Sequence, residues 1–247
     1  MFLLKYFFSY LKLKEFNLCV NIKSKDDNMT DRLKEFGKSI TILIGFFVFQ
    51  IIIYNFCFPL MKNATKTLDV FTIFLLSIIL FFLFKNDMIS QFKAIKKQKA
   101  KVFIRYLIIF LFANFLVYII NNILYSSLND IATNEANNQI SVLTNPYLSF
   151  ISICLLAPFY EEILFRLNFK NLFKNKWIFI TFTGIFFASL HLLSAQSISE
   201  ILYIIPYSIL GITLSYIYKD SNIIYNSILI HALNNIIQFI IILTGGI

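Results

Sequence analysis

Cysteine, histidine and tryptophan are scarce in this chain of 247 residues, which holds three, two and one of them. Cys19, Cys57 and Cys154 are far apart and form no CxxC pair, which argues against a disulfide framework and against a thiolate zinc site. Glycine and proline number only six and four, and no Pro/Gly-rich linker divides the chain. Neither HExxH nor GxSxG occurs, so no motif supports a zincin or a serine hydrolase.

Long apolar runs dominate the sequence instead. Hydrophobic residues make up 58% of it and aromatic residues 18%, and the mean hydropathy is +0.74, well above that of soluble domains. A membrane-spanning helix needs about 20 predominantly apolar residues. The candidate spans cover residues 39–61, 67–84, 102–124, 147–169, 177–195, 200–218 and 222–244. We therefore predict an all-α, multi-pass transmembrane bundle of about seven spans, forming one transmembrane domain over residues 39–247.

Lysine and arginine are distributed very unevenly between the predicted loops. Eighteen of the 22 fall in residues 1–38, 85–101 and 170–176 and at Lys219, whereas the opposite set of loops holds only two. Because basic loops stay on the cytoplasmic side of a membrane, we predict a cytoplasmic N-terminus and an external C-terminus in the cell membrane. The net charge of +9 is thus a topology signal that can also hold anionic lipid headgroups, and nucleic-acid binding is not expected.

Two further segments lie outside the predicted spans. The N-terminal segment 1–38 begins with apolar residues interrupted by lysines and has no small-residue cleavage site. A cytoplasmic helix lying in the membrane interface is therefore expected there, rather than a signal peptide. The polar segment 125–146 carries no lysine or arginine. We expect it to be a solvated external loop, with a short helix that ends before Pro146 and with no chemistry of its own.

Five ionisable side chains lie deep inside the late predicted spans. They are Glu161, Glu162, Arg166, His191 and His231. On lenient insertion scales a charged side chain costs about 2.5–3.5 kcal/mol at the centre of a membrane helix, so such residues usually mark a working site. Because these five occupy three separate spans, we expect a functional site where those spans meet.

The fourth predicted span holds both glutamates. Glu162 and Arg166 are four residues apart, so they share a helix face and can pair, which lowers the cost of burying both charges. Glu161 is turned by about 100° from Glu162 and has no cation three or four residues further on, which leaves it available for chemistry. Pro158 removes the backbone hydrogen bond to the carbonyl of Cys154 and predicts a kink beside the carboxylates.

The two histidines belong to the fifth and seventh predicted spans. His231 and Asn235 are four residues apart, and their shared helix face must point to protein or to a water-filled cavity. At 1.5 Å per residue from the cytoplasmic boundary, Glu161 and His231 lie at a depth of about 13 Å. His191 lies deeper, at about 22 Å. A fifth span that began nearer Thr181, after a stretch of interfacial helix anchored by Trp177, would remove most of this difference.

Two histidines and an available glutamate permit two kinds of amide hydrolysis. Imidazole and carboxylate suit zinc with an open position for water, so Glu161, His191 and His231 could bind this metal. Without a metal, Glu161 and His191 would orient and deprotonate a water molecule. His231 and Asn235 would then donate hydrogen bonds to the oxyanion of a tetrahedral intermediate. The residues alone leave both mechanisms open.

Three short motifs follow one another along the late spans. EEILFR at 161–166 has the form EExxxR, FASLH at 187–191 has the form FxxxH, and HALNN at 231–235 has the form HxxxN. In this order they resemble the CPBP family of intramembrane proteases, the CAAX protease and bacteriocin-processing (Abi) group, which includes the type II CAAX prenyl endopeptidases. The resemblance implies a catalytic core at 147–247, within an all-helical bundle whose cavity opens to the cytoplasm.

The resemblance also implies a role for each motif residue. Glu161 would be the water-activating base, and His191 its partner on that water or on a metal ion. His231 and Asn235 would stabilise the oxyanion, and the ion pair of the EExxxR motif would support the site. The implied activity is endopeptidase cleavage of a membrane-associated protein or peptide. The alternative is a non-catalytic immunity or accessory protein that binds in the same cavity, whereas a coupled transporter is disfavoured because inverted repeats are lacking.

Overall fold

The computed structural model describes residues 27–61 and 64–245, which contain helices and turns but no strand. The chain divides into two compact units, Met1–Lys34 and Glu35–Ile247. In its described part the first unit holds the opening turns of helix α2 (Asp27–Cys57), with an exposed ion pair of 4.0 Å between Lys34 and Asp31. The interfacial helix predicted at the start of the chain lies outside the described residues.

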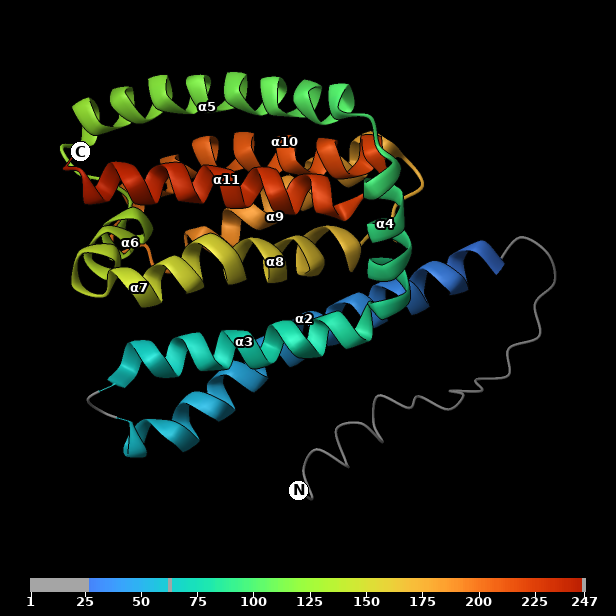
Figure 1. The fold of residues 1–247 in the computed structure, drawn as a ribbon, viewed down its shortest axis with the longest axis horizontal. Helices are drawn as coiled ribbons and strands as arrows, with labels where there is room; N and C mark the ends of the chain where they lie inside the picture. The colour runs from blue at the N-terminus through green and yellow to red at the C-terminus, as the bar shows by residue number, and fades with distance from the viewer. Residues whose placement is uncertain (1–26, 62–63, 246–247) are drawn as a thin grey trace. The chain divides into compact units, whose positions relative to one another are not determined.

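The second unit is built from long helices joined by short turns. After α2 the order is η1 (Phe58–Leu60), α3 (Thr65–Leu83), α4 (Lys85–Lys97), α5 (Ala100–Leu128), α6 (Thr133–Thr144), α7 (Pro146–Ser149), η3 (Phe150–Leu156), α8 (Ala157–Glu162), η4 (Ile163–Leu167), α9 (Lys176–His191), η5 (Ile198–Tyr203), α10 (Ile204–Ser221) and α11 (Ile224–Leu243). Helices α5, α8, α9, α10 and α11 run side by side (Figure 1). The predicted all-α class is confirmed.

Most of these helices are long and apolar enough to cross a membrane. Six such stretches occur among the described residues: Thr30–Cys57, Thr65–Leu83, Ala100–Leu128, Pro146–Leu167, Ile198–Ser221 and Ile224–Leu243. Helix α9 is also apolar but has only 16 residues, about 24 Å at 1.5 Å per residue, and it is shorter than the predicted span 177–195. Large side chains such as Phe112 and Phe115 are exposed, as lipid contact requires. The chain is therefore a multi-pass membrane protein.

The two ends of the bundle differ in structure and in charge. Helix α4 crosses the end at which α11 begins (Figure 1). There Gln91 Oε1 accepts a hydrogen bond from the backbone N–H of Ile224 at 2.7 Å, and the amides of Gln98 and Asn226 exchange two hydrogen bonds of 2.9 Å. We call this the lysine-rich end because it carries the lysines of residues 85–101 and 170–176. The opposite end, where α6 lies, is called the lysine-poor end.

Helices α9 and α10 approach each other closely at two glycines. A Cβ atom added at Gly184 would lie 2.6 Å from the backbone nitrogen of Ile212, and one added at Gly211 would lie 2.5 Å from the carbonyl oxygen of Gly184. Beside this contact, Thr183 Oγ1 donates a hydrogen bond to Ser215 Oγ at 2.9 Å. Small residues thus let the backbones of the two helices meet, as in other membrane helix pairs.

We expect Gly184→Ala to lower the free energy of unfolding by about 1–3 kcal/mol, because the added methyl group meets backbone that must move. Gly45→Ala is the matched control. A Cβ at Gly45, in α2, meets nothing within 4 Å, and alanine is the better helix former by up to about 1 kcal/mol. Thermal unfolding midpoints of the purified proteins in detergent measure the difference. Equal midpoints for the two variants would contradict the close contact.

Candidate active site

The two glutamates lie in the short helix α8, between two wider helical segments. Segments η3 and η4 are π-helical: the N–H of Ala157 donates to Ser152 O, and the N–H of Asn168 donates to Ile163 O, each five residues back. The sequence predicted only a kink at Pro158. π-Helical turns are rare and occur frequently at functional sites. Their position on both sides of α8 therefore indicates that this span carries a functional site.

The carbonyl left without a helical partner is that of Ile153. Pro158 has no N–H, and in π-helical register its missing bond falls five residues back, on Ile153, and not on Cys154 as α-helical spacing predicted. Asn235 Nδ2 donates to Ile153 O at 2.9 Å. Helix α11 therefore supplies the hydrogen bond that the proline cannot, which gives Asn235 a structural contact besides the predicted role at the oxyanion.

Asn235→Leu is expected to lower the free energy of unfolding by about 1–3 kcal/mol, because a partly buried carbonyl loses its donor. In a Pro158→Ala background the same substitution should cost less, since the alanine N–H can serve Ile153. A double-mutant cycle on thermal unfolding measures this coupling. Strictly additive losses would contradict the bond. If Asn235 also serves the oxyanion, cleavage stays impaired in the double variant even where stability recovers.

Glu162 and Arg166 form a fully buried ion pair. Arg166 Nη1 lies 3.1 Å from Glu162 Oε1, and neither side chain is exposed to solvent (0% each). Arg166 Nη2 donates to the carbonyl of Gly211 at 3.1 Å, and the guanidinium lies 4.6 Å from the centre of the Phe187 ring. The predicted pair is thus present, and it also links α8 to α9 and α10.

His231 stands between the two glutamates. Its Nδ1 lies 3.0 Å from Glu162 Oε1, and its Nε2 lies 3.8 Å from Glu161 Oε2. Because the ionised Glu162 can only accept, we assign the hydrogen to Nδ1. Glu161 also accepts a hydrogen bond from the hydroxyl of Tyr160 at 3.2 Å. With 13% of its side chain exposed, against 0% for Glu162, Glu161 is the glutamate that solvent or substrate can reach.

His191 is the last residue of α9. Its Nδ1 lies 2.9 Å from the carbonyl oxygen of Phe187, which fixes the hydrogen on Nδ1 and leaves Nε2 for other partners. The imidazole packs between the rings of Phe187 and Tyr207, at centroid distances of 4.3 and 5.1 Å. Helix α9 begins at Lys176 and runs without a break through Thr181. His191 lies further toward the lysine-poor end than its partners.

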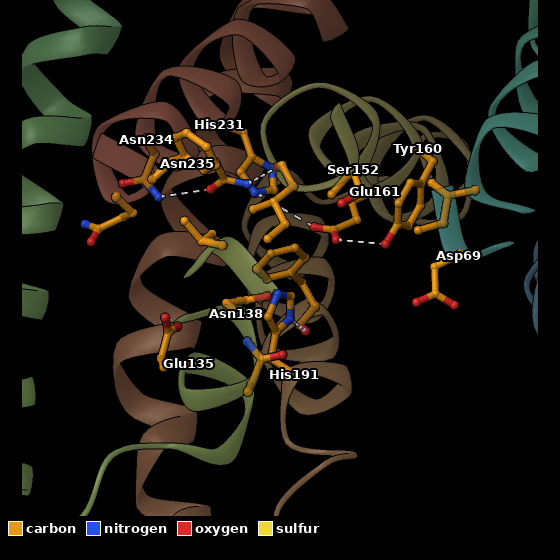
Figure 2. A pocket seen from close by; sticks show the side chains of 18 of the residues that line it. Asp69, Glu135, Asn138, Ser152, Tyr160, Glu161, His191, His231, Asn234 and Asn235 are labelled. Carbon is orange, nitrogen blue, oxygen red and sulfur yellow. Dashed lines mark hydrogen bonds and ion pairs between the residues drawn. The ribbon is translucent and has the colours of Figure 1, made fainter. Parts of the chain in front are cut away.

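One cavity nevertheless joins these groups. It has a volume of about 650 Å³, and Glu161, His191, His231 and Asn235 all contribute to its lining. Figure 2 shows Glu161 between His231 and Tyr160, with His191 further along the same space. A smaller cavity of about 200 Å³ is also lined by Glu161 and His191. Three helices thus bring the predicted catalytic side chains to a common space.

The short helix expected before Pro146 is present as α6, and it lines this cavity, which the sequence did not predict. Asn134, Glu135 and Asn138 border the cavity, and Figure 2 shows Glu135 and Asn138 near His191. The signal in the sequence is a run of amide and acidic side chains on one short helix. Such side chains on the inner face of a helix indicate a polar cavity next to it. That signal becomes readable only once α6 is known to fold back over the bundle.

Glu135 is connected to His191 through an aromatic ring. Its Oε1 accepts a hydrogen bond from the hydroxyl of Tyr207 at 3.2 Å, and the Tyr207 ring packs on His191. Glu135 is exposed where it borders the cavity, but the protein packed around it removes part of its hydration and so raises the pKa of its carboxyl above the ordinary value. The Tyr207 hydrogen bond and the charge of His191 oppose that rise. A fourth helix thus contributes to the environment of His191.

The zinc site considered from the sequence does not fit this arrangement. Both histidines have Nδ1 held by an acceptor and Nε2 available, as metal-binding histidines do. However, among the described residues no three or more His, Cys, Asp or Glu side chains are grouped so that they could hold a metal ion. Glu161, His191 and His231 line one cavity but are not grouped as three ligands of one ion.

The position of the cavity along the bundle differs from what the resemblance implied. Its floor lies near mid-bundle, at Glu161, His231 and Leu214, and its walls continue to Asn55 at the end of α2 and Ile242 near the end of α11. None of the described lining residues belongs to α4. The cavity therefore faces the lysine-poor end. If the lysine-rich end is cytoplasmic, as the distribution of lysines predicts, the cavity cannot also open to the cytoplasm, as the resemblance implies.

Fold and cavity together define a multi-pass helical membrane protein with a glutamate–histidine site inside the bundle. Residues 143–237 match the family model described as Type II CAAX prenyl endopeptidase Rce1-like. This range includes all three motifs, and it confirms the resemblance read from them. This part of the chain is therefore similar to the Rce1-like family of membrane proteins.

Three relatives come from Lactococcus lactis subsp. lactis (strain IL1403). UPF0177 protein YaiF is 28% identical over 221 residues, which are 83% of this chain and 98% of YaiF. UPF0177 protein YaiH is 34% identical over 105 residues, 40% of this chain and 42% of YaiH. UPF0177 protein YbdI is 28% identical over 131 residues, 50% of this chain and 69% of YbdI. No solved structure matches the chain significantly.

Proposed function

We propose that this chain is an intramembrane endopeptidase of the cell membrane, which hydrolyses a peptide bond in a membrane-associated protein or peptide. The observation that supports this is the common cavity lined by Glu161, His191 and His231, each from a different helix. Its volume of about 650 Å³ is within the range of about 300–1,000 Å³ for ligand pockets. The match of residues 143–237 to a family model described as Type II CAAX prenyl endopeptidase Rce1-like supports the same reaction class.

The reaction begins with a water molecule beside Glu161. The carboxylate accepts one proton of this water, and the water oxygen forms a bond to the carbonyl carbon of the peptide. The second O–H of the water stays intact and donates a hydrogen bond to His191 Nε2, because His191 Nδ1 is held by the Phe187 carbonyl. When the C–N bond breaks, Glu161 transfers its proton to the leaving nitrogen. Glu161 thus acts first as base and then as acid, and no other proton source is needed.

The oxyanion forms on the side of the cavity where α11 lies. His231 turns Nε2 toward the oxyanion and would donate from it when that nitrogen carries a hydrogen, while its Nδ1–H continues to donate to Glu162 Oε1. Asn235 uses one Nδ2 hydrogen for Ile153 O, and its second hydrogen is the further donor. A donor of this kind typically contributes about 10²–10³-fold in rate. The buried Glu162–Arg166 pair fixes the His231 ring and so acts by positioning.

Chelation separates this mechanism from a zinc mechanism. After dialysis of the purified protein against a strong chelator, we expect the cleavage rate to change by less than about twofold, because no step uses a metal ligand. The readout is the initial rate on one peptide before and after chelation, with zinc added back. Loss of the rate by at least tenfold and its return with zinc would replace the metal-free mechanism.

A comparison of membrane peptides tests the proposed function in the cell. Strains that express either the wild-type chain or Glu161→Ala at equal membrane levels are compared by mass spectrometry. We expect specific fragments to disappear in the variant and their intact precursors to accumulate. Identical peptide profiles would contradict the endopeptidase proposal. A protective phenotype that survives Glu161→Gln would favour the immunity or accessory role in its place.

A further inference from the structure

We infer that the cavity is reached from the extracytoplasmic side of the membrane, so its substrate is a peptide segment held at that face by a membrane anchor. Only the statement that the bound peptide is a substrate rests on the proposed function. The side from which the cavity is reached follows from three independent features of the chain: the end of the bundle to which the cavity extends, the packing that closes its other end, and the positions of the charges.

The cavity extends to the lysine-poor end. Its polar rim there comes from four elements, with Asn55 at the end of α2, Lys66 at the start of α3, Asn138 on α6 and Gln238 near the end of α11. Polar side chains at these positions require water or a polar ligand, because lipid cannot satisfy them. Water therefore reaches Glu161 from this end.

The opposite side of Glu161 is closed by packed apolar side chains. One core cluster fills the bundle between the glutamates and the lysine-rich end, and Leu167, Phe169, Phe179 and Ile224 in it are all 0% exposed. Ser39 and Asn168 add two hydrogen bonds across this layer, of 2.8 and 3.0 Å. A peptide cannot pass such a layer without unfolding it, since protein interiors pack as densely as organic crystals.

The charges of the second unit identify the closed end as cytoplasmic. Residues 85–101 and 170–176 place nine lysines at the closed end. Among the described residues, the rim of the cavity carries only Lys66, together with the carboxylates Asp69 and Glu135. Because lysine-rich ends of membrane bundles stay in the cytoplasm, the open end faces outward. The cytoplasmic opening implied by the family resemblance is thus not expected for this chain.

This placement restricts the substrate. A segment must approach Glu161 along α6 and the ends of α2 and α3, so it belongs to a polypeptide whose chain next to its membrane anchor is outside. A soluble cytoplasmic peptide, or the cytoplasmic tail of a lipid-anchored protein, would have to pass the packed layer at the lysine-rich end to reach the carboxylate.

Cysteine labelling in intact cells tests the inference without any need for cleavage. In a background without native cysteines, Asn138→Cys places a thiol on the rim, and Ser90→Cys places one on the exposed face of α4 as the matched control. We expect a membrane-impermeant maleimide to label Asn138→Cys in intact cells and Ser90→Cys only after permeabilisation. Labelling of Asn138→Cys only after permeabilisation, or not at all, would overturn the inference and leave the endopeptidase proposal standing.

The same variants test the route of the substrate. Once a processed substrate is known, its cleavage is followed in intact cells before and after labelling. We expect the adduct at Asn138→Cys to slow processing at least fivefold, and the reagent to leave processing in Ser90→Cys cells unchanged. Unchanged processing by fully labelled Asn138→Cys would overturn this route. Absence of any processing by the unlabelled variants and by wild type alike would instead count against the endopeptidase.

Discussion

Glu161→Gln is expected to lower the rate of peptide cleavage by about 10²–10⁴-fold, the usual contribution of a general base. Glutamine has nearly the same shape, and its amide oxygen can still accept the Tyr160 hydroxyl that lies 3.2 Å from Glu161. It cannot take a proton from water. Binding of the peptide should therefore change little while turnover is lost, so the effect falls on kcat and not on KM.

Asp69→Asn is the matched control for this substitution. Asp69 borders the same cavity but has no part in the proposed proton transfer, and we expect its loss to change the cleavage rate by less than about fivefold. Initial rates of the purified proteins on one peptide, at equal amounts of folded protein, provide the comparison. If the Glu161→Gln variant kept more than a tenth of the wild-type rate, Glu161 would not be the general base.

Arg166→Met is expected to destabilise the folded protein by about 3–5 kcal/mol, because it leaves Glu162 as an uncompensated buried charge. Both members of this pair are 0% exposed, and the guanidinium also donates to Gly211 O at 3.1 Å. A loss of this size is a large fraction of the stability of a typical domain. Most of the variant should therefore fail to accumulate as folded protein.

Removing both charges should restore much of that stability. In Glu162→Leu combined with Arg166→Met no buried charge is left unpaired, and apolar replacement of a buried pair is often neutral. Cleavage should stay low in this double variant, because His231 loses the acceptor that lies 3.0 Å from its Nδ1. Yield of folded protein and thermal unfolding midpoint are the measurements. A single Arg166→Met variant as stable as the double variant would contradict the account of the pair.

The class of fold could be predicted from the sequence because a bilayer imposes a simple length rule. Apolar runs of about 20 residues predict spanning helices with few alternatives, and the boundaries of the predicted spans 102–124 and 222–244 lie within a few residues of α5 and α11. The fifth span was predicted too long, since α9 ends at His191. Composition does not locate the end of a helix whose following turn is also apolar.

The sequence predicts the individual residues of the site, but not the backbone and the helix that surround them. The i, i+4 spacing of Glu162 and Arg166 foretells a shared helix face, and the pair is present at 3.1 Å. The two π-helical segments beside α8 could not be foreseen, because they depend on contacts such as that between Asn235 and Ile153 across the bundle. The same holds for the place of α6 over the cavity, which long-range packing decides.

The side of the cavity illustrates a third kind of limit on sequence-based inference. Depth counted from one boundary gave about 13 Å for both Glu161 and His231, which seemed to suit a cytoplasmic opening. Depth does not say on which side of a residue the packing is open. Only the fully buried layer at Leu167 and Phe179 decides that, and it closes the lysine-rich side.

The most direct test of the account is the experimental structure of Glu161→Gln with an uncleaved substrate peptide bound. We expect the peptide to lie extended in the cavity between α6 and α11. Its scissile carbonyl carbon should lie about 3–4 Å from a water held by the side chain at position 161, the usual approach distance for reacting atoms. His191 should contact the same water, with His231 toward the carbonyl oxygen. A peptide bound on the lipid-facing surface, out of reach of position 161, would contradict the proposed chemistry.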